Sequence, residues 1–178
     1  MKTKRIVITG GPGTGKTTLI KRLEERGFTC LHEVSREVTK KAQQEGIEQL
    51  FLTDPLLFSE RLLQGRLQQF QEANNFKKEQ LFYDRGLPDV TAYMDYASQS
   101  YPEHFTKVCT ENRYDLVFLL PPWKKIYKQD NERYESFSEA EKIHDALLDG
   151  YKAYNYDVQL VPTGSVEKRI TFILENLK

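Results

Sequence analysis

The sequence has few of the features that mark several common classes of protein. Its two cysteines in 178 residues, Cys30 and Cys109, lie far apart and match no metal-ligand spacing, which indicates buried thiols in a reducing compartment. The formal net charge is zero, so the totals give no sign of a nucleic-acid or membrane-surface binder. No apolar run is long enough to span a membrane, and no secretory signal precedes the first predicted strand. We therefore expect a cytoplasmic protein with no transmembrane segment and no nucleic-acid partner.

Patterns that would indicate a metalloenzyme or a serine hydrolase are also missing. Of the three histidines, His104 and His144 fall on predicted helices without a partner at metal-ligand spacing. The sequence contains no nucleophilic serine–histidine arrangement, no internal repeat, no low-complexity tract and no linker. The length suits one domain, and we expect residues 1–178 to form it.

One demanding motif lies near the start of the chain. Residues 10–18 read G-G-P-G-T-G-K-T-T and fit G-x-x-x-x-G-K-[ST] at every fixed position. An apolar run precedes the motif and a helical pattern, Thr18 to Arg26, follows it, which is the strand–loop–helix context that a phosphate-binding loop requires. The glycines let backbone N–H groups wrap closely around a phosphate chain. The residues predicted to bind ATP, with GTP as the alternative nucleotide, are Gly11, Pro12, Gly13, Thr14, Gly15, Lys16, Thr17 and Thr18.

Two side chains of the motif have expected roles in chemistry. Lys16 would reach the β- and γ-phosphates of the nucleotide, and Thr17 would place its hydroxyl on Mg²⁺. The positive end of the following helix would add to the attraction for the phosphates.

Strand-like and helix-like stretches alternate along the rest of the chain. The predicted strands are residues 6–8, 28–32, 81–83, 116–120 and 158–162, and the predicted helices are 18–26, 33–46, 55–73, 88–97, a short one from 101, 138–152 and a last one from 166. This alternation predicts an α/β fold with a five-stranded parallel sheet, helices on both faces and right-handed crossovers. We expect Asp54 to cap the third helix, and Ser138 with Glu141 to form a capping box.

Ligands of such sheets bind beyond the carboxyl ends of the strands, so residues at strand ends are candidates for chemistry. Asp84, after the third strand, could hold Mg²⁺ beside Thr17, or could be an ordinary turn residue. Arg85 could grip a phosphate or an acceptor hydroxyl, or pair with a nearby acid. Glu33, after the second strand, could act as a general base, orient a water, or simply cap the next helix.

Further candidates carry weaker patterns. Arg36 could bind a polar acceptor or face solvent, and the acceptor pocket is expected among the helices around Arg36, Arg61 and Gln64. Lys128 and Arg133 belong to a basic stretch that could close on the triphosphate, although such charge runs are usually only solvated surface. The turn containing Pro162 and Gly164 could lie against a purine ring or could cap the last helix.

Together these motifs resemble the NadR-like AAA-domain P-loop proteins, which belong with the nucleoside and nucleotide kinases. The resemblance rests on residues 10–18, 32–37, 82–89, 119–122, 132–135, 161–162 and 166–167. It implies the strand order 2-3-1-4-5, a lid at about residues 121–137, and Glu33 as the acid that takes the acceptor proton. As in thymidylate kinases, Asp84-Arg85 is followed by Ala92-Tyr93. Arg85 stands where hexameric remodelling ATPases carry a glutamate that activates water.

Two functions from different classes follow. The first is a kinase that moves the γ-phosphoryl of Mg-ATP to a hydroxyl of a small, nucleoside-like acceptor. The alternative is a nucleotide-dependent switch with slow ATP or GTP hydrolysis and a macromolecular or lipid partner. A non-enzymatic domain with an inactive site is a third reading. The sequence identifies neither the acceptor nor the oligomeric state.

Overall fold

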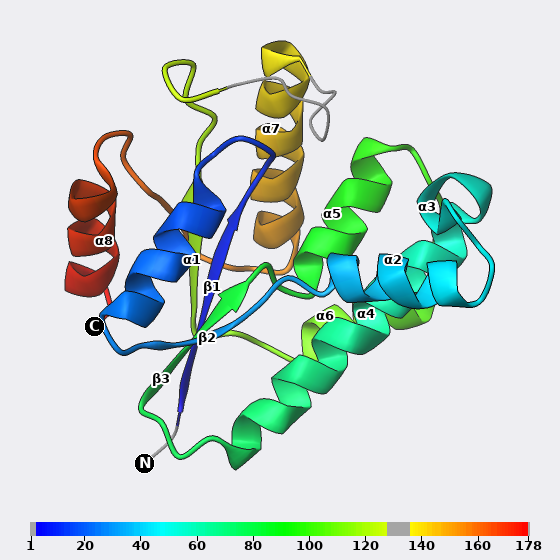
Figure 1. Ribbon diagram of the computed structural model, residues 1–178, viewed down its shortest axis with the longest axis horizontal. Coiled ribbons are helices and arrows are strands. Elements are labelled where there is room, and N and C mark those ends of the chain that lie inside the picture. The colour runs from blue at the N-terminus through cyan, green and yellow to red at the C-terminus, as the bar shows by residue number, and fades with distance from the viewer. Residues whose placement is uncertain (1–2, 128–135, 178) are drawn as a thin grey trace.

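The computed structural model describes residues 3–127 and 136–177. Five parallel strands form its sheet: β1 (Lys4–Gly10), β2 (Thr29–Leu31), β3 (Gln80–Asp84), β4 (Leu116–Leu120) and β5 (Val158–Leu160). The strand order is β2-β3-β1-β4-β5, which confirms the predicted order. Because β1 lies in the middle of the sheet, its carboxyl end has the ends of β3 and β4 on either side (Figure 1).

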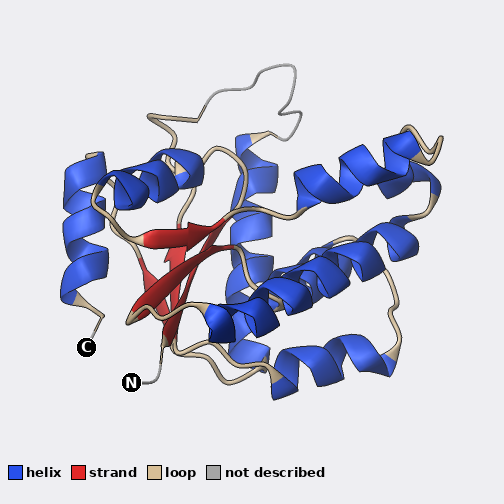
Figure 2. Cartoon of the chain, turned by 60° about the horizontal axis from the view of Figure 1, so that its bottom comes forward, coloured by secondary structure: helices blue, strands red, loops and turns tan. Residues whose placement is uncertain are grey.

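Helices cover both faces of the sheet, as the alternation of elements predicted (Figures 1 and 2). The helices are α1 (Lys16–Glu25), α2 (Ser35–Gln44), α3 (Leu50–Thr53), α4 (Pro55–Glu72), the 3-10 turn η1 (Ala73–Asn75), α5 (Pro88–Tyr96), α6 (Glu103–Glu111), α7 (Phe137–Ala153) and α8 (Val166–Glu175). No helix in the described part of the chain combines the length and the hydropathy needed to cross a bilayer.

Alternate residues of the central strand supply the two halves of the core. Ile6 and Ile8 pack with α1 and α8 on one face, whereas Val7 packs with α4, α5, α6 and α7 on the other. All three side chains are fully buried. This burial on both faces explains why the strand is a continuous run of β-branched residues, as is typical of parallel sheets.

Several element boundaries differ from the predicted ones. The capping box of α7 is formed by Ser136 and Glu139 rather than by Ser138 and Glu141, because the Ser136 hydroxyl accepts from the Glu139 N–H at 3.2 Å and the Glu139 carboxylate accepts from the Ser136 N–H at 2.6 Å. Asp54 caps α4, as expected, and Pro55 is the first helical residue. The single turn of α3 was not predicted.

Candidate active site

The loop between β1 and α1 has the backbone of a phosphate cradle. Gly13 and Gly15 have φ values of 72° and 81°, in the left-handed region that favours glycine. A Cβ atom on Gly10 would lie 2.9 Å from the carbonyl oxygen of Leu120, so the loop also passes too close to β4 for a larger residue. Among the described residues no side chain caps the start of α1, which leaves its first N–H groups available to an anion.

A pocket of about 570 Å³ lies over this loop, and we call it the loop pocket. Its lining contains every loop residue that the sequence predicted, together with four predicted residues from strand ends and the start of α2. The lining residues are Gly11, Pro12, Gly13, Thr14, Gly15, Lys16, Thr17, Thr18, His32, Glu33, Ser35, Arg36, Asp84 and Arg85. The structure therefore brings the carboxyl ends of β1, β2 and β3 together around one opening.

Lys16 and Asp84 face each other in the loop pocket, with Lys16 Nζ 3.8 Å from Asp84 Oδ1. Burial, reinforced by the charge of Arg85, lowers the pKa of Lys16 from 10.5 to about 8. Burial also raises the pKa of Asp84. The surroundings of Lys16 and Asp84 therefore favour the neutral forms of both side chains. A bound phosphate or metal ion would change this environment.

The donors around Asp84 fit a magnesium ion that is completed by phosphate oxygens. Asp84 Oδ1 is buried without a hydrogen-bond partner among the described residues, and the exposed hydroxyl of Thr17 lines the same pocket. Residues 3–127 and 136–177 contain no group of three or more His, Cys, Asp or Glu side chains that could hold a metal alone. Mg²⁺ commonly takes one or two protein oxygens and fills its octahedron with water and substrate phosphates.

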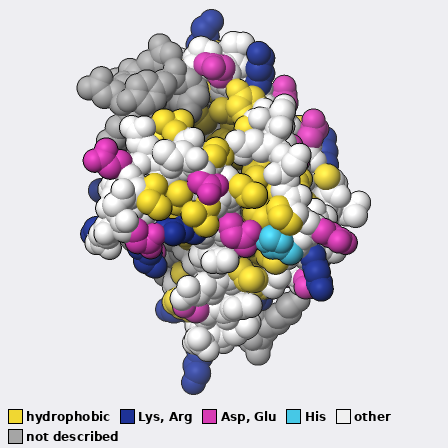
Figure 3. All heavy atoms as spheres, turned by 90° about the vertical axis from the view of Figure 1, so that its right-hand side faces the viewer, with side chains coloured by type: hydrophobic (Ala, Val, Ile, Leu, Met, Phe, Trp, Pro, Cys, Tyr) yellow, Lys and Arg dark blue, Asp and Glu magenta, His cyan; other side chains and the backbone are white. Residues whose placement is uncertain are grey.

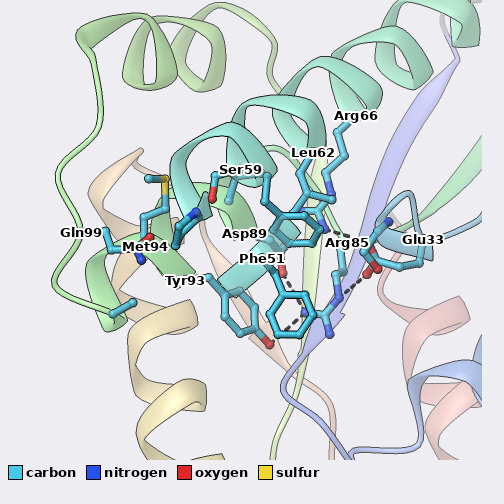
Figure 4. A pocket seen from close by; sticks show the side chains of 15 residues that line it. Glu33, Phe51, Ser59, Leu62, Arg66, Arg85, Asp89, Tyr93, Met94 and Gln99 are labelled. Carbon is cyan, nitrogen blue, oxygen red and sulfur yellow. Dashed lines mark hydrogen bonds and ion pairs between the residues drawn. The ribbon is translucent and has the colours of Figure 1, made fainter. Parts of the chain in front are cut away.

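Glu33 is clamped between two arginines (Figure 4). Its Oε1 accepts from Arg66 at 2.9 Å, and its Oε2 pairs with Nε of Arg85. Burial alone would raise the pKa of Glu33, but the charges of Arg66 and Arg85 outweigh it and lower the pKa from 4.5 to about 2. Glu33 is thus a fixed carboxylate and a weak base.

Arg85 is held in place by its backbone and by a second carboxylate. Its φ of 72° is unusual for a residue with a side chain, and its N–H donates to the Ile8 carbonyl of β1 at 3.0 Å. Its guanidinium lies 3.5 Å from Asp89 and donates to the Tyr93 hydroxyl at 3.2 Å. Asp89 is fully buried and also accepts from Thr9, Gly86 and Tyr151. These contacts fix the Arg85 guanidinium in position relative to β1.

A second hollow of about 470 Å³ lies beyond this network, between α4 and α5, and we call it the apolar cavity (Figure 4). The residues lining it are Glu33, Ser35, Phe51, Pro55, Phe58, Ser59, Leu62, Arg66, Arg85, Asp89, Val90, Tyr93, Met94, Ala97 and Gln99. Glu33, Ser35 and Arg85 line both hollows, so the loop pocket and the apolar cavity adjoin at these residues.

The face of the molecule that carries α3 and the adjoining ends of α4 and α5 also exposes apolar side chains (Figure 3). Phe51, Leu52 and Leu56 are 47%, 63% and 43% exposed.

Not every predicted residue reaches these hollows. Arg36 lines the loop pocket but not the apolar cavity. Gln64 lies in a separate groove between α2 and α4, where its amide donates to Glu60 at 3.3 Å. Residues two positions apart on a helix point to nearly opposite sides, so Leu62 faces the apolar cavity and Gln64 faces away.

A third hollow, of about 470 Å³, lies on the α8 side of the loop. Gly164, Trp123 and Arg169 line it, whereas Pro162 does not. The predicted lid, about residues 121–137, is described only in part, and Lys128 and Arg133 lie outside the described residues. Tyr127 packs on Phe137 with ring centroids 5.5 Å apart.

Two buried arginines of the site were missed in the sequence. Arg66 is 4% exposed and, besides Glu33, donates to the Gly86 carbonyl at 3.1 Å. Arg169 is equally buried and donates to the Thr14 carbonyl of the loop at 2.6 Å. Arg66 follows Leu63 by one turn on the apolar stripe of its helix, and a charge at such a position signals a buried partner.

Comparisons with known proteins agree with this architecture. A family model described as an AAA domain matches residues 5–169. No curated protein matches the chain. Among solved structures, a deoxyadenosine kinase from M. mycoides is 19% identical with a TM-score of 0.67, covering 97% of this chain and 98% of that one.

Two further solved structures resemble the chain at similar identity. A NadR protein in complex with NR is 18% identical with a TM-score of 0.69, and the match covers 97% of this chain but only 50% of that chain. A thymidylate kinase from Candida albicans is 16% identical with a TM-score of 0.71, covering 98% and 90%. At these identities the likeness concerns the fold, which is that of the P-loop nucleoside and nucleotide kinases.

Proposed function

The chain belongs to the AAA-domain family of P-loop proteins, and from that premise we propose that it is a kinase that transfers the γ-phosphoryl of Mg-ATP to a hydroxyl of a small, nucleoside-like acceptor. One observation carries the proposal: the loop pocket and the apolar cavity adjoin at Glu33 and Arg85. A donor nucleotide in the first hollow and an acceptor in the second would meet there. The similar folds of deoxyadenosine kinase and of NadR support the same reaction class.

The transfer itself requires little covalent participation by the protein. The acceptor oxygen forms a bond to the γ-phosphorus, the bond to the β–γ bridging oxygen breaks, and ADP leaves. Because such transition states are loose, catalysis consists mostly of positioning and charge stabilisation. Lys16 and the loop N–H groups hold the β- and γ-phosphates, and Arg85 stabilises the charge that develops on the transferring group.

Glu33 orients the acceptor. Glu33 Oε1 accepts from Arg66 and from the Ser35 N–H, whereas Oε2 has Arg85 as its partner and keeps a second lone pair for the acceptor hydroxyl. It accepts a hydrogen bond from the acceptor hydroxyl and aims the oxygen at the phosphorus. With a pKa of about 2 it does not retain the proton, which passes to solvent or to the phosphorylated product.

Magnesium and the lid complete the proposed donor site. Thr17 and Asp84 would hold Mg²⁺, which would neutralise part of the phosphate charge. Arg133 and Lys128, outside the described residues, are proposed to approach the triphosphate from the lid. Gly164, in the third hollow, and Pro162 beside it are proposed to lie against the purine.

A switch with slow hydrolysis is the competing function, and a product analysis separates the two. The protein is incubated with Mg-ATP and a panel of ribo- and deoxynucleosides, and products are identified by mass spectrometry. The kinase proposal predicts one or more phosphorylated acceptors in amounts equal to the ADP formed. ADP and inorganic phosphate released without any phosphorylated acceptor would contradict the proposal and favour the switch.

A further inference from the structure

At the inner end of the apolar cavity, the positive and negative side chains are equal in number and pair with one another. The charged residues of its lining are Arg66, Arg85, Glu33 and Asp89. Arg66 pairs with Glu33 at 2.9 Å, and Arg85 pairs with Glu33 and lies 3.5 Å from Asp89. Two guanidinium groups therefore face two carboxylates, and this end of the cavity has no excess positive charge with which to bind a phosphate group.

The loop pocket has a cation that no carboxylate balances. Besides Lys16, which lies 3.8 Å from Asp84, its lining includes Arg36, which forms no ion pair within residues 3–127 and 136–177. It also offers the free N–H groups at the start of α1. A phosphate is therefore stabilised in the loop pocket, whereas in the apolar cavity it would be desolvated without a partner of opposite charge.

The rest of the cavity wall suits a flat, uncharged ring. Phe51, Phe58 and Tyr93 contribute aromatic surface, and Leu62 and Met94 contribute aliphatic surface. Gln99 lies at the end of the cavity opposite Glu33 and Arg85 (Figure 4). Its side-chain amide has no hydrogen-bond partner in the part of the chain that the structure describes. It can therefore donate to and accept from the polar edge of a ring.

From this distribution we infer that the acceptor is an unphosphorylated nucleoside, and that nucleoside monophosphates are excluded from the apolar cavity. The inference rests on the proposed kinase function and narrows its acceptor. The hydroxyl lies at the Glu33–Arg85 end, the ring lies between the aromatic walls, and Gln99 reads the edge of the base. The kinase is thus of the nucleoside type rather than the nucleotide type.

The test measures binding without ATP. Adenosine, guanosine, cytidine, uridine and thymidine, each beside its 5′-monophosphate, are titrated calorimetrically into the wild type and into Ala97→Trp. Ala97 lines the cavity and is exposed, so tryptophan there fills the cavity without disturbing the core. Ala153→Trp, on an exposed position of α7 outside the described hollows, is the matched control.

We expect at least one nucleoside to bind at least about tenfold more tightly than its monophosphate, and this binding to be lost in Ala97→Trp but kept in Ala153→Trp. A monophosphate that binds as tightly as its nucleoside through the same cavity would overturn the inference, as would failure of every nucleoside to bind. Because the titration contains no ATP, its outcome does not depend on catalysis. A monophosphate that is phosphorylated in the separate product analysis would overturn the inference and the hydroxyl acceptor, but not the kinase class. A protein that binds nucleosides but forms no product would contradict only the kinase proposal.

The role of Gln99 is tested on the nucleoside that binds best. Gln99→Leu is expected to weaken its binding about tenfold, because the polar edge of the base loses its partner, while ATP binding is unchanged. Gln43→Leu, on an exposed position of α2, is the control. Unchanged nucleoside affinity in Gln99→Leu would remove Gln99 from the recognition of the base.

Discussion

The two hollows that adjoin at Glu33 and Arg85 are built in opposite ways. The loop pocket is lined largely by one continuous run, residues 11–18, whose backbone and first helical turn make the contacts. The apolar cavity is assembled from the start of α2, from α3, α4 and α5, and from the segment that follows α5. The loop pocket therefore has a local sequence signature, whereas the cavity exists only once distant helices pack together.

The two hollows also differ in charge. The loop pocket presents backbone N–H groups and Arg36, which pairs with no carboxylate in the described part of the chain, whereas both arginines of the cavity pair with its carboxylates. The difference indicates how such a fold can divide its tasks. The backbone of the loop pocket would bind the donor nucleotide, and the side chains of the cavity would select the acceptor. The predictions below either separate the two hollows or test what joins them.

The largest expected effect separates donor from acceptor binding. Lys16→Ala should reduce phosphoryl transfer by about 10²–10³-fold or more, because the ammonium group that holds the phosphates is removed. Nucleoside binding in the apolar cavity should remain within about twofold of wild type, since Lys16 does not line it. Kinetics and calorimetry on Lys16→Ala check both expectations. Lys21→Ala, an exposed lysine of α1, is the control, and equal loss in both variants would refute the role of Lys16.

A second prediction concerns Arg66, which links α4 to Glu33. Arg66→Met should lower the free energy of unfolding by about 3–5 kcal/mol, because Glu33 and the Gly86 carbonyl would lose a buried partner. Arg61→Met, on the same helix but in a half-exposed pair with Glu45, should cost less than about 1 kcal/mol. Urea unfolding of the two variants gives the comparison. Similar losses of unfolding free energy in the two variants would show that the buried ion pair stabilises the protein no more than the half-exposed one.

The third prediction follows from the lowered pKa of Glu33. Its pKa falls from 4.5 in the unfolded chain to about 2 in the folded one, so the folded state holds this carboxylate ionised and gains stability on the order of 3 kcal/mol above pH of about 4.5. That gain disappears as the pH falls from about 4.5 to about 2. The difference in unfolding free energy between wild type and Glu33→Gln should shrink over the same interval. A difference in unfolding free energy between the two proteins that stays constant with pH would contradict the lowered pKa of Glu33.

The smallest effect concerns the pH dependence of the loop pocket. Because the pKa of Lys16 is about 8 in the free protein, the ammonium group is lost above that pH, and the dissociation constant for Mg-ATP should then rise by up to about tenfold per pH unit. Nucleoside binding should show no such rise. Titrations at pH 7, 8 and 9 in wild type and Lys16→Met make the comparison, and an identical pH dependence in both proteins would exclude Lys16 as its source.

The sequence was sufficient for the sheet, the loop and the residues at strand ends. Period and alternation fix the order of elements, and a parallel sheet brings its carboxyl ends to one edge, so Lys16, Glu33, Asp84 and Arg85 meet as expected. The strand order itself came from the resemblance. The roles assigned to these residues, and to Lys128 and Arg133, stay predictions.

The sequence was insufficient for the acceptor side. Gln64 was expected near the acceptor, but the rotation of α4 about its axis decides which residues face the cavity, and that rotation depends on packing against α2 and α5. Arg66 was missed for the same reason, whereas Gln99 lies in the segment after α5, for which the sequence predicted no part in the site. The pairing of Glu33 with two arginines could not be predicted either, because Arg66 lies on α4, far from Glu33 in the sequence.

The central claim, that donor and acceptor meet across Glu33 and Arg85, is tested most directly by a compound in which adenosine and a nucleoside are joined through a chain of phosphates. Calorimetric titration should give one molecule bound per chain, more tightly than ATP or the nucleoside alone, with affinity reduced both by Lys16→Ala and by Ala97→Trp. A linked compound that binds no more tightly than ATP, and whose affinity Ala97→Trp leaves unchanged, would contradict the account.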